Sequence, residues 1–363
     1  MRIAILGSIA LPVPPPAQGG TEWIAYYQAI GLSKKGHEVI LFAAKGTAEN
    51  FKDSKVEVVE VGGGDVVSGS NSERAFDPAL VEGSRKMRLE IVYLTQAAKA
   101  LIDYKDEYDV VLNNMRGEAL FLPIVKLLNK SFVNVMHLDL FSELAETFLE
   151  FKTNVITISN AQRKDFPNLN YLATVYNGVD VGKFKFNDTP QDYLLMMGSI
   201  GRHKNQGEAI AVAKELGLKL VLAGKIRDQD YFSELKKDID GEQIKYLSEV
   251  SFDEKVKLYQ NAKAFLFPIL WEEPFGLVMI EAMSCGTPVV AFNHGAIPEV
   301  VVDGLTGYVV EDHSQMIEVV KKIDAIDRAV CRKHVEDNFS VGKMIDGYEK
   351  ALQKLMSKLL LMV

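Results

Sequence analysis

Cysteine is scarce in this chain, since only Cys285 and Cys331 occur among 363 residues. The two lie far apart in sequence and match no metal-ligand spacing, so neither a disulfide framework nor a cysteine-based metal site is expected. A reducing compartment such as the cytoplasm is the simplest setting.

Basic residues are fewer than acidic ones. The chain has 41 lysines and arginines and 49 aspartates and glutamates, which gives a net charge of -8. Nucleic acid is therefore not an expected partner, because no basic stripe is available to neutralise its phosphates.

Long apolar runs are missing as well. No apolar segment approaches the ~20 residues that a membrane-spanning helix needs. The opening residues 1–7 have a short apolar run and no small-residue cleavage site, so we expect a protein that is not exported. We therefore predict a cytoplasmic location. Peripheral contact with the inner face of the membrane is a secondary alternative, which rests on an apolar stripe over residues 352–363.

Short apolar runs alternate with helical patterns along most of the chain. A chain of 363 residues favours two domains, each with its own core. Buried strands are predicted at 3–6, 39–43, 56–61, 109–112, 132–136, 155–158, 193–197, 218–223, 264–267 and 289–292. Strands that alternate with helices indicate doubly wound parallel sheets. The polar segment 185–192 contains Pro190 and suits a hinge between the two domains.

The stretch from Trp271 to Pro288 carries the strongest functional pattern. It lies between two of the predicted strands and contains a short helix over residues 277–284. A helix that begins just past the carboxyl end of a parallel strand directs unpaired N–H groups into the crevice where open α/β sheets bind ligands. The backbone donors here belong to Phe275, Gly276, Leu277 and Val278. They predict an anion site.

Two carboxylates accompany these amides. Glu273 lies in the loop ahead of the helix, and Glu281 lies about one turn inside it. An ionised carboxylate is a good acceptor for sugar hydroxyls, just as free amides suit a phosphate. The alternative reading is that Glu273 only caps the helix and interacts with its dipole.

The pattern Glu273-x7-Glu281 continues through residues 284–291, 295–301 and 303–307 without a gap. It resembles family 4 of the retaining glycosyltransferases, strongly in this part of the chain and more loosely before it. The resemblance implies the GT-B fold, in which two Rossmann-like domains face each other across a cleft and the last helix returns to the N-terminal domain. We therefore predict an acceptor-side domain over 1–185 that includes a returning helix at about 340–363, and a nucleotide-sugar domain over 190–338.

The function that this resemblance implies is the retaining transfer of a hexose from a UDP- or GDP-linked sugar to an acceptor hydroxyl. The acceptor class stays open between a glycan, a lipid-linked molecule and a small molecule. Neither a cofactor nor a metal is expected, because donors fixed in advance can stabilise the charge on a leaving diphosphate. Two other functions also remain open: a nucleotide-sugar epimerase of the same architecture, and a non-catalytic sugar-nucleotide-binding protein.

Two cations and a glycine follow the predicted strand 193–197. The family carries Gly-Arg and then a lysine at this place, and Gly198 and Lys204 match the glycine and the lysine. The arginine is displaced, because Ser199 occupies its position and Arg202 comes three residues later. We predict that Lys204 and Arg202 hold the donor diphosphate, with a plain surface role for Arg202 as the alternative.

Three further glycines are predicted to border the donor. Gly19 and Gly20 end a proline-rich loop after the first strand and resemble the family's glycine loop, which faces the diphosphate. A plain strand-to-helix connection is the alternative. Gly224 follows the strand 218–223, and its lack of a side chain would permit close approach of a nucleotide.

The remaining predicted site residue is His137, at the carboxyl tip of the strand 132–136. Ligands bind at such tips, although a core histidine is the alternative. The resemblance implies that His137 contacts the transferred sugar and shapes the acceptor face, that Glu273 orients the sugar hydroxyls and that Glu281 binds the ribose. Asp228-Gln229-Asp230 has a metal-binding form, but it lies at an acidic, solvated helix start and no metal role is expected.

Overall fold

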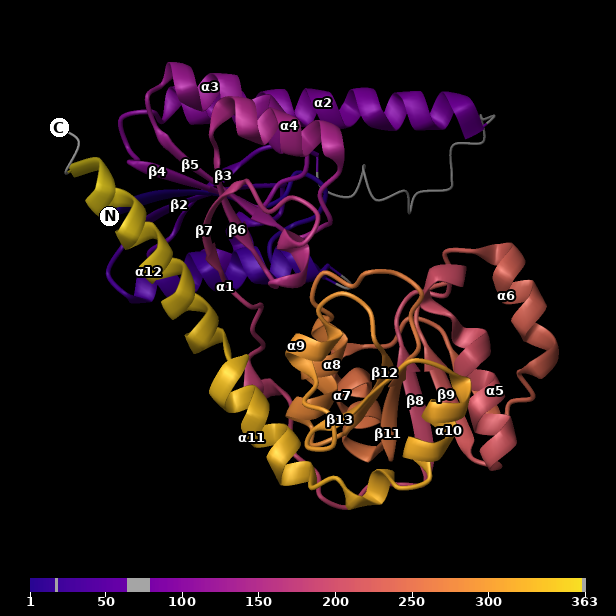
Figure 1. The fold of residues 1–363 in the computed structure, drawn as a ribbon. Coiled ribbons are helices and arrows are strands. Elements are labelled where there is room, and N and C mark those ends of the chain that lie inside the picture. The colour runs from indigo at the N-terminus through magenta and orange to yellow at the C-terminus, as the bar shows by residue number, and fades with distance from the viewer. Residues whose placement is uncertain (17–18, 64–78, 361–363) are drawn as a thin grey trace. The chain divides into compact units, whose positions relative to one another are not determined.

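The computed structural model describes residues 1–16, 19–63 and 79–360 and consists of two compact units (Figure 1). The first unit comprises Met1–Ile158, Arg163–Val175 and Ile345–Val363, and the second comprises Ser159–Gln162 and Tyr176–Met344. Each contains one parallel sheet with helices on both faces. The predicted fold class, with two Rossmann-like α/β domains and a last helix that returns to the first of them, is confirmed.

The sheet of the first unit has seven parallel strands in the order β3-β2-β1-β4-β5-β6-β7. They are β1 Arg2–Leu6, β2 Glu38–Ala43, β3 Glu57–Glu60, β4 Val110–Asn113, β5 Ser131–Met136, β6 Asn154–Thr157 and β7 Asn170–Thr174. The strand order reverses between β1 and β4. The loops that follow these two strands therefore diverge at the carboxyl edge, which is where open α/β sheets bind ligands.

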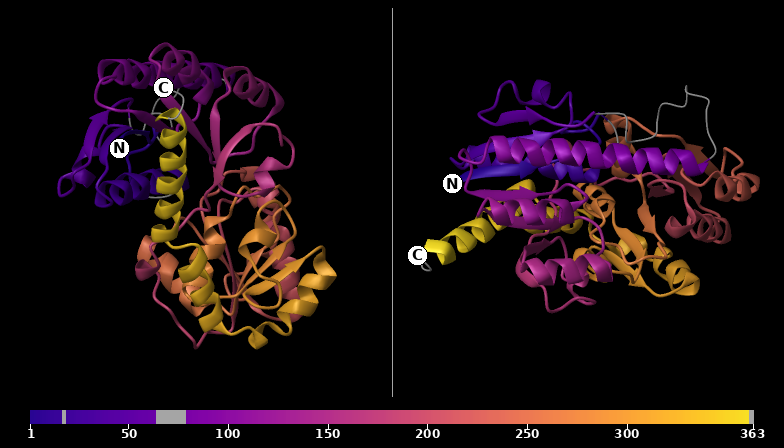
Figure 2. Two further views of the ribbon diagram at one scale, coloured as in Figure 1. Left: turned by 60° about the vertical axis from the view of Figure 1, so that its left-hand side comes forward. Right: turned by 90° about the horizontal axis from the view of Figure 1, so that it is seen from above.

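Helices cover both faces of this sheet (Figure 2). They are α1 Gly20–Lys34, α2 Ala79–Asp103, α3 Phe121–Leu127, α4 Ser142–Phe151 and α12 Val341–Leu360. Buried side chains of α2, α3 and α4 share one apolar cluster with Phe42, Val111 and Phe132 of the strands. Helix α12 instead packs on α1, where a Cβ atom added to Gly31 would lie 2.5 Å from Ile345. No helix within the described ranges is both long and apolar enough to cross a membrane.

The sheet of the second unit has six parallel strands in the order β10-β9-β8-β11-β12-β13. They are β8 Tyr193–Met197, β9 Lys219–Ala223, β10 Ile244–Leu247, β11 Ala264–Phe267, β12 Val289–Phe292 and β13 Gly307–Val310. The helices are α5 Gln206–Leu216, α6 Gln229–Leu235, α7 Phe252–Asn261, α8 Leu277–Ser284, α9 Ile297–Val300, α10 His313–Val320 and α11 Arg328–Asn338. The order reverses between β8 and β11, so the loops after these strands, including the stretch at 271–276, meet at the switch point.

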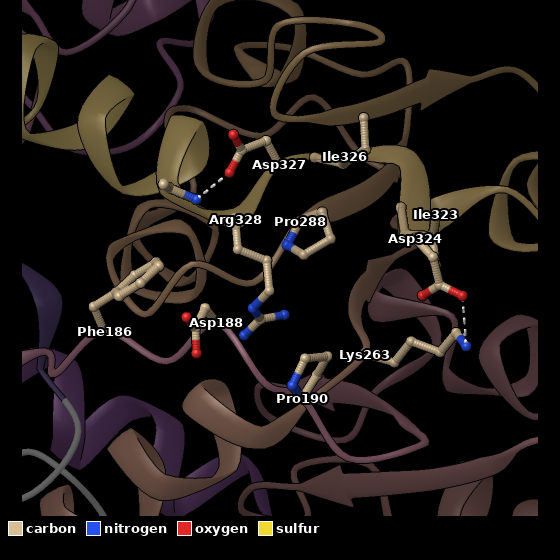
Figure 3. Close-up of a pocket in the computed structure, with 11 residues that line it drawn as sticks. Phe186, Asp188, Pro190, Lys263, Pro288, Ile323, Asp324, Ile326, Asp327 and Arg328 are labelled. Atoms are coloured by element: carbon tan, nitrogen blue, oxygen red, sulfur yellow. Dashed lines mark hydrogen bonds and ion pairs between the residues drawn. The ribbon is translucent and has the colours of Figure 1, made fainter.

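A pocket of about 460 Å³ lies at the opposite, amino edge of this sheet (Figure 3). Arg328 lines it, but its guanidinium is fully engaged in holding the fold together. It donates hydrogen bonds to the carbonyl oxygens of Asn187, Gln260 and Ala262 and to the hydroxyl of Thr287 at 2.8–3.0 Å. We therefore interpret Arg328 as a structural brace.

An ion-paired histidine joins α10 to α5. His313 Nδ1 lies 2.6 Å from Glu208, and its Nε2 lies 3.1 Å from Glu215. Hydrogen bonds to these two carboxylates raise the pKa of His313 above its ordinary value of about 6.5. Because the charged form is favoured in the folded state, this stabilisation is complete below pH 6.5 and is lost as pH rises through the folded pKa.

We therefore expect His313→Gln to lower the free energy of unfolding more at pH 6 than at pH 8.5. Urea denaturation of both proteins at the two pH values measures the difference. An equal loss at both pH values would contradict a charged role for His313.

Candidate functional site

The amino end of α8 presents a group of free backbone donors. Gly276 directly precedes the helix with a φ of 87°, a left-handed conformation that favours glycine. Within the described part of the chain, no hydrogen-bond acceptor meets the amides of Phe275, Gly276, Leu277 or Val278. These donors lie at the positive end of the helix dipole, so the arrangement can bind an anion.

Lys204, Glu273 and Trp271 form a contact group, here called the Lys204 cluster. Glu273 links it to these donors, because a Cβ atom added to Gly276 would lie 3.5 Å from Cγ of Glu273. Oε2 of Glu273 accepts hydrogen bonds from Lys204 Nζ at 3.2 Å and from the indole N–H of Trp271 at 3.0 Å. The ammonium group also lies 4.8 Å from the centre of the Trp271 ring. Only 17% of the Lys204 side chain and 12% of the Glu273 side chain are exposed, so solvent screens this pair weakly.

The backbone of Glu273 is fixed by the turn that follows β12. Ala296 N donates to the Glu273 carbonyl at 2.8 Å, and Gly295 N donates to the Glu272 carboxylate at 2.7 Å. Gly295 adopts a φ of 57°, and a Cβ atom at this position would lie 2.4 Å from Glu273 N. Only glycine therefore fits here. The sequence pattern included Gly295 but did not reveal this role.

Lys204 comes from the loop that follows β8, and Gly224 begins the loop that follows β9. Gly224 has a φ of 146°, and a Cβ atom added to it would lie 2.0 Å from the carbonyl oxygen of Gly198. The two loops thus pack backbone against backbone. This contact gives a structural reason for Gly224, beside the predicted close approach of a nucleotide, which stays a prediction.

Arg202 belongs to a different surface group from Lys204. Its guanidinium donates hydrogen bonds to Glu234 of α6 and lies 3.8 Å from a carboxylate oxygen of Asp228. It also lies over the Tyr231 ring, and 58% of its side chain is exposed. Contact between Arg202 and a diphosphate would require the side chain to leave both carboxylates, so that role stays a prediction.

Asp228 caps α6 by accepting a hydrogen bond from Tyr231 N at 2.9 Å. Asp230 follows it in the first turn of the same helix. In the described residues, no group of three or more histidine, cysteine, aspartate or glutamate side chains is arranged to hold a metal ion.

Glu281 has its own partners on α7. Its carboxylate lies 2.7 Å from Lys255 Nζ and accepts a hydrogen bond from the Tyr259 hydroxyl at 3.2 Å. Burial, and then the Glu281 charge, raises the pKa of Tyr259 well above its ordinary value, so its hydroxyl stays protonated and donates. The sequence did not identify Lys255, because nothing in its spacing indicates a contact across two helices.

In the first unit, His137 lies at the end of β5 in a buried amide network. Its Nε2 lies 2.8 Å from Oδ1 of Asn114, which follows β4. Nδ2 of Asn114 donates to the carbonyl of Leu6 and to Gln28, so its Oδ1 is the acceptor and His137 Nε2 is assigned as the donor. Among the described residues, nothing hydrogen-bonds to His137 Nδ1. Sequence reasoning missed Asn114 and Gln28, although Asn114 is polar and stands at a strand tip.

The imidazole of His137 is neutral in this setting. Burial, assisted by the positive charge of Arg116, lowers the pKa of His137 to about 4. A neutral ring with Nε2 protonated keeps an acceptor lone pair on Nδ1. His137 can therefore accept a hydrogen bond from a hydroxyl group at physiological pH.

The glycine pair of the first unit begins α1. Gly20 is the first residue of the helix, and Glu22 in its first turn accepts a hydrogen bond from the Ser8 hydroxyl at 2.9 Å. A Cβ atom on Gly19 would lie 2.7 Å from both Glu22 and Pro15. Local packing therefore requires glycine at position 19, and contact of Gly19 and Gly20 with a diphosphate stays a prediction.

Comparison with known proteins gives three kinds of similarity. Residues 182–328 match the family model of glycosyl transferases group 1. A phosphatidyl-myo-inositol mannosyltransferase of Mycolicibacterium smegmatis is 25% identical over 85% of this chain and 81% of its own length. HepE of Anabaena, solved in complex with UDP-glucose, is 18% identical, with a TM-score of 0.71 over 98% of this chain and 99% of its own. The structural likeness shows that the fold is GT-B.

Other curated relatives match over shorter segments. An uncharacterized glycosyltransferase of Methanocaldococcus jannaschii is 27% identical over 51% of this chain and 54% of its own length. A glycogen synthase of Mycobacterium tuberculosis is 30% identical over 39% of this chain and 36% of its own length. The matched segment thus spans about half of the first relative and about a third of the second.

The depressed pKa of His137 gives a pH prediction. Its value of about 4 is below the ordinary 6.5, so the folded state favours the neutral ring and loses stability as pH falls from about 6.5 toward 4. We expect NMR titration of the His137 ring to give a pKa near 4, and His137→Gln to reduce the loss of stability over this interval. A titration midpoint near 6.5 would contradict a neutral ring held in this partly buried position.

The fit of Gly295 gives a stability prediction. We expect Gly295→Ala to lower the free energy of unfolding by about 2–4 kcal/mol, because the new methyl group meets the Glu273 backbone in addition to the strain of a positive φ. Gly241→Ala is the matched control, since Gly241 has a φ of 80° and nothing within 4 Å of an added Cβ atom. Equal losses in urea denaturation would show that the contact with Glu273 is unimportant.

Proposed function

We propose that this protein is a retaining, metal-independent glycosyltransferase that moves a hexose from a UDP- or GDP-linked sugar to an acceptor hydroxyl. The observation that carries the proposal is the Lys204 cluster, in which Lys204 pairs with Glu273, and Glu273 lies just before the four free amides at the start of α8. The group 1 match over residues 182–328 covers the same part of the chain. Structural neighbours that contain UDP and UDP-glucose support a nucleotide-sugar as the donor.

The donor diphosphate is proposed to bind the amides of α8 and the ammonium group of Lys204. In the structure, Lys204 is paired with Glu273 at 3.2 Å. A diphosphate carries more negative charge than one carboxylate, so it competes effectively for this cation. When the leaving diphosphate gains charge, these fixed donors stabilise it without reorganising.

Once Lys204 binds the diphosphate, the Glu273 carboxylate is proposed to orient the sugar. Release from Lys204 frees lone pairs on its carboxylate, while the Trp271 N–H continues to hold Oε2. The free oxygens can accept hydrogen bonds from sugar hydroxyls. The turn at Gly295 and Ala296 keeps the Glu273 backbone in place during this exchange.

Glu281 is proposed to bind the ribose. A carboxylate offers about four acceptor positions, of which Lys255 and Tyr259 occupy two. Two positions remain for ribose hydroxyls. Lys255 and Tyr259 fix the carboxylate in one orientation, which reduces the entropy that ligand binding would otherwise cost.

His137 is proposed to contact a hydroxyl of the transferred sugar and to shape the acceptor face. Its neutral ring suits this role, because an imidazolium can only donate hydrogen bonds, whereas the neutral ring can also accept one from a hydroxyl. Asn114 sets the tautomer that leaves Nδ1 as the acceptor. The acceptor itself stays open between a glycan, a lipid-linked molecule and a small molecule, and a cytoplasmic location stays a prediction.

The proposal is tested with purified protein and a panel of UDP- and GDP-sugars, first by thermal shift and then by transfer to candidate acceptors. We expect Lys204→Ala to weaken donor binding at least tenfold. The variant lacks the cation that binds the diphosphate, and the charge of the Glu273 carboxylate is no longer balanced. Lys219→Ala is the control, since Lys219 is an exposed lysine at the amino end of β9. We expect Glu273→Gln to lower turnover more than donor affinity.

The outcomes separate the three functions. Conversion of the donor sugar to its epimer without an acceptor would identify an epimerase. Donor binding that depends on Lys204, with no transfer to any acceptor, would favour a binding protein. Donor binding that is the same in Lys204→Ala and in the unmodified protein would contradict the proposed site.

A further inference from the structure

A second candidate site lies in the first unit, away from the residues described above. It is a cavity of about 490 Å³ at the amino ends of β5, β6 and β7, and Ser131, Asn154 and Asn170 contribute to its wall. His137 follows the opposite, carboxyl end of β5. The cavity is therefore separate from the edge of the sheet where we place sugar chemistry.

Five lysines line this cavity: Lys126, Lys130, Lys152, Lys354 and Lys358. They come from α3 and the residues after it, from the end of α4 and from α12, so the fold gathers them from distant parts of the sequence. No aspartate or glutamate is among the lining residues. This concentration of positive charge runs against the chain's net charge of -8.

None of these five lysines forms an ion pair with a carboxylate of the described residues, whereas many other lysines of the chain do so. Lys130 donates to the carbonyl of Tyr108 at 2.7 Å and lies over the ring of the same residue. Lys354 and Lys358 stand four residues apart on α12, a spacing at which like charges repel each other on a helix. An anion bound in the cavity would relieve this repulsion.

The wall of the cavity is apolar beneath this cationic rim. Leu122, Val125, Phe132 and Leu355 are buried side chains that line it. The ammonium group of Lys126 lies 5.4 Å from the centre of the Phe151 ring, which also lines the cavity. Leu122, Val125 and Phe132 also belong to the apolar core of this unit, so the cavity opens onto the core. The combination fits a ligand with a phosphate and an apolar part.

Leu127 adds an apolar contact next to this rim. It follows Lys126 directly at the end of α3, and 86% of it is exposed to solvent. An exposed leucine among lysines is typical of surfaces that insert an apolar side chain between lipid headgroups while the cations contact phosphates. Nucleic acid is less suitable, because the cluster lacks the arginines that recognise phosphates by paired hydrogen bonds.

We propose that this cavity binds the headgroup of an acidic phospholipid and docks the first unit on an anionic membrane surface. The lysines attract the bilayer, and each contributes about fivefold to affinity at moderate salt. The apolar wall and Leu127 contact the glycerol and upper acyl region. The inference does not depend on the proposed sugar transfer, since it rests on a different edge of the molecule.

Co-sedimentation of the full chain with lipid vesicles tests the proposal. We expect binding to phosphatidylcholine vesicles that contain phosphatidylglycerol, and at least tenfold weaker binding to pure phosphatidylcholine. The combined substitution Lys126→Gln, Lys152→Gln, Lys354→Gln and Lys358→Gln should reduce binding to the anionic vesicles at least tenfold. The matched control replaces four exposed lysines of the second unit by glutamine and should retain binding: Lys219, Lys236, Lys237 and Lys245.

Leu127→Glu is a second, independent variant. The exposure of Leu127 means that this change should leave the fold intact, as thermal unfolding can verify, and it should also weaken vesicle binding. Equal losses in the two quadruple variants would show a general charge effect and overturn the proposal. So would binding to inorganic phosphate or single-stranded RNA through the same lysines, without binding to anionic vesicles.

Discussion

The proposed donor site depends on the unpaired backbone amides at the start of α8. A strand that ends at Phe267 and a glycine with a left-handed φ at 276 leave these N–H groups without acceptors in the described chain. Unpaired donors in a partly buried place are costly unless a ligand satisfies them. Glu273 lies next to them, 3.5 Å from a Cβ atom added to Gly276, and its charge is balanced by Lys204. In the proposed site, a diphosphate supplies both the missing acceptors and the charge that competes for Lys204.

Both units follow the same rule about the edges of a parallel sheet. Polar groups suited to chemistry follow the carboxyl ends of strands: His137 and Asn114 in the first unit, and the Lys204 cluster in the second. The amino edges of the two sheets differ. The amino edge of the second unit contains the structural Arg328, and that of the first unit contains the lysine-lined cavity. The chemistry proposed at the carboxyl edges thus leaves the amino edges available for bracing and for the proposed docking.

The fold could be predicted from sequence because buried parallel strands appear as short continuous apolar runs, and each predicted run corresponds to a strand. The position of His137 at the end of a strand, and the match of Lys204 to a lysine of the family, could also be read from the sequence. Contacts that join distant segments could not be predicted from the sequence. Examples are the contacts of Gly295 with Glu273, of Lys255 with Glu281 and of Asn114 with His137. The orientation of the Arg202 side chain depends on Glu234 of α6 and on Asp228, which caps that helix, and no local pattern reveals these contacts.

The most direct test of the central claim is an amide-resolved NMR titration of the protein with UDP. The account predicts that the amide signals of residues 275–278 shift downfield together as they gain phosphate acceptors, with the same apparent dissociation constant. It also predicts that the Lys204 ammonium loses its contact with Glu273 at the same UDP concentration. Unchanged amide signals at 275–278, with UDP bound elsewhere in the second unit, would contradict the account.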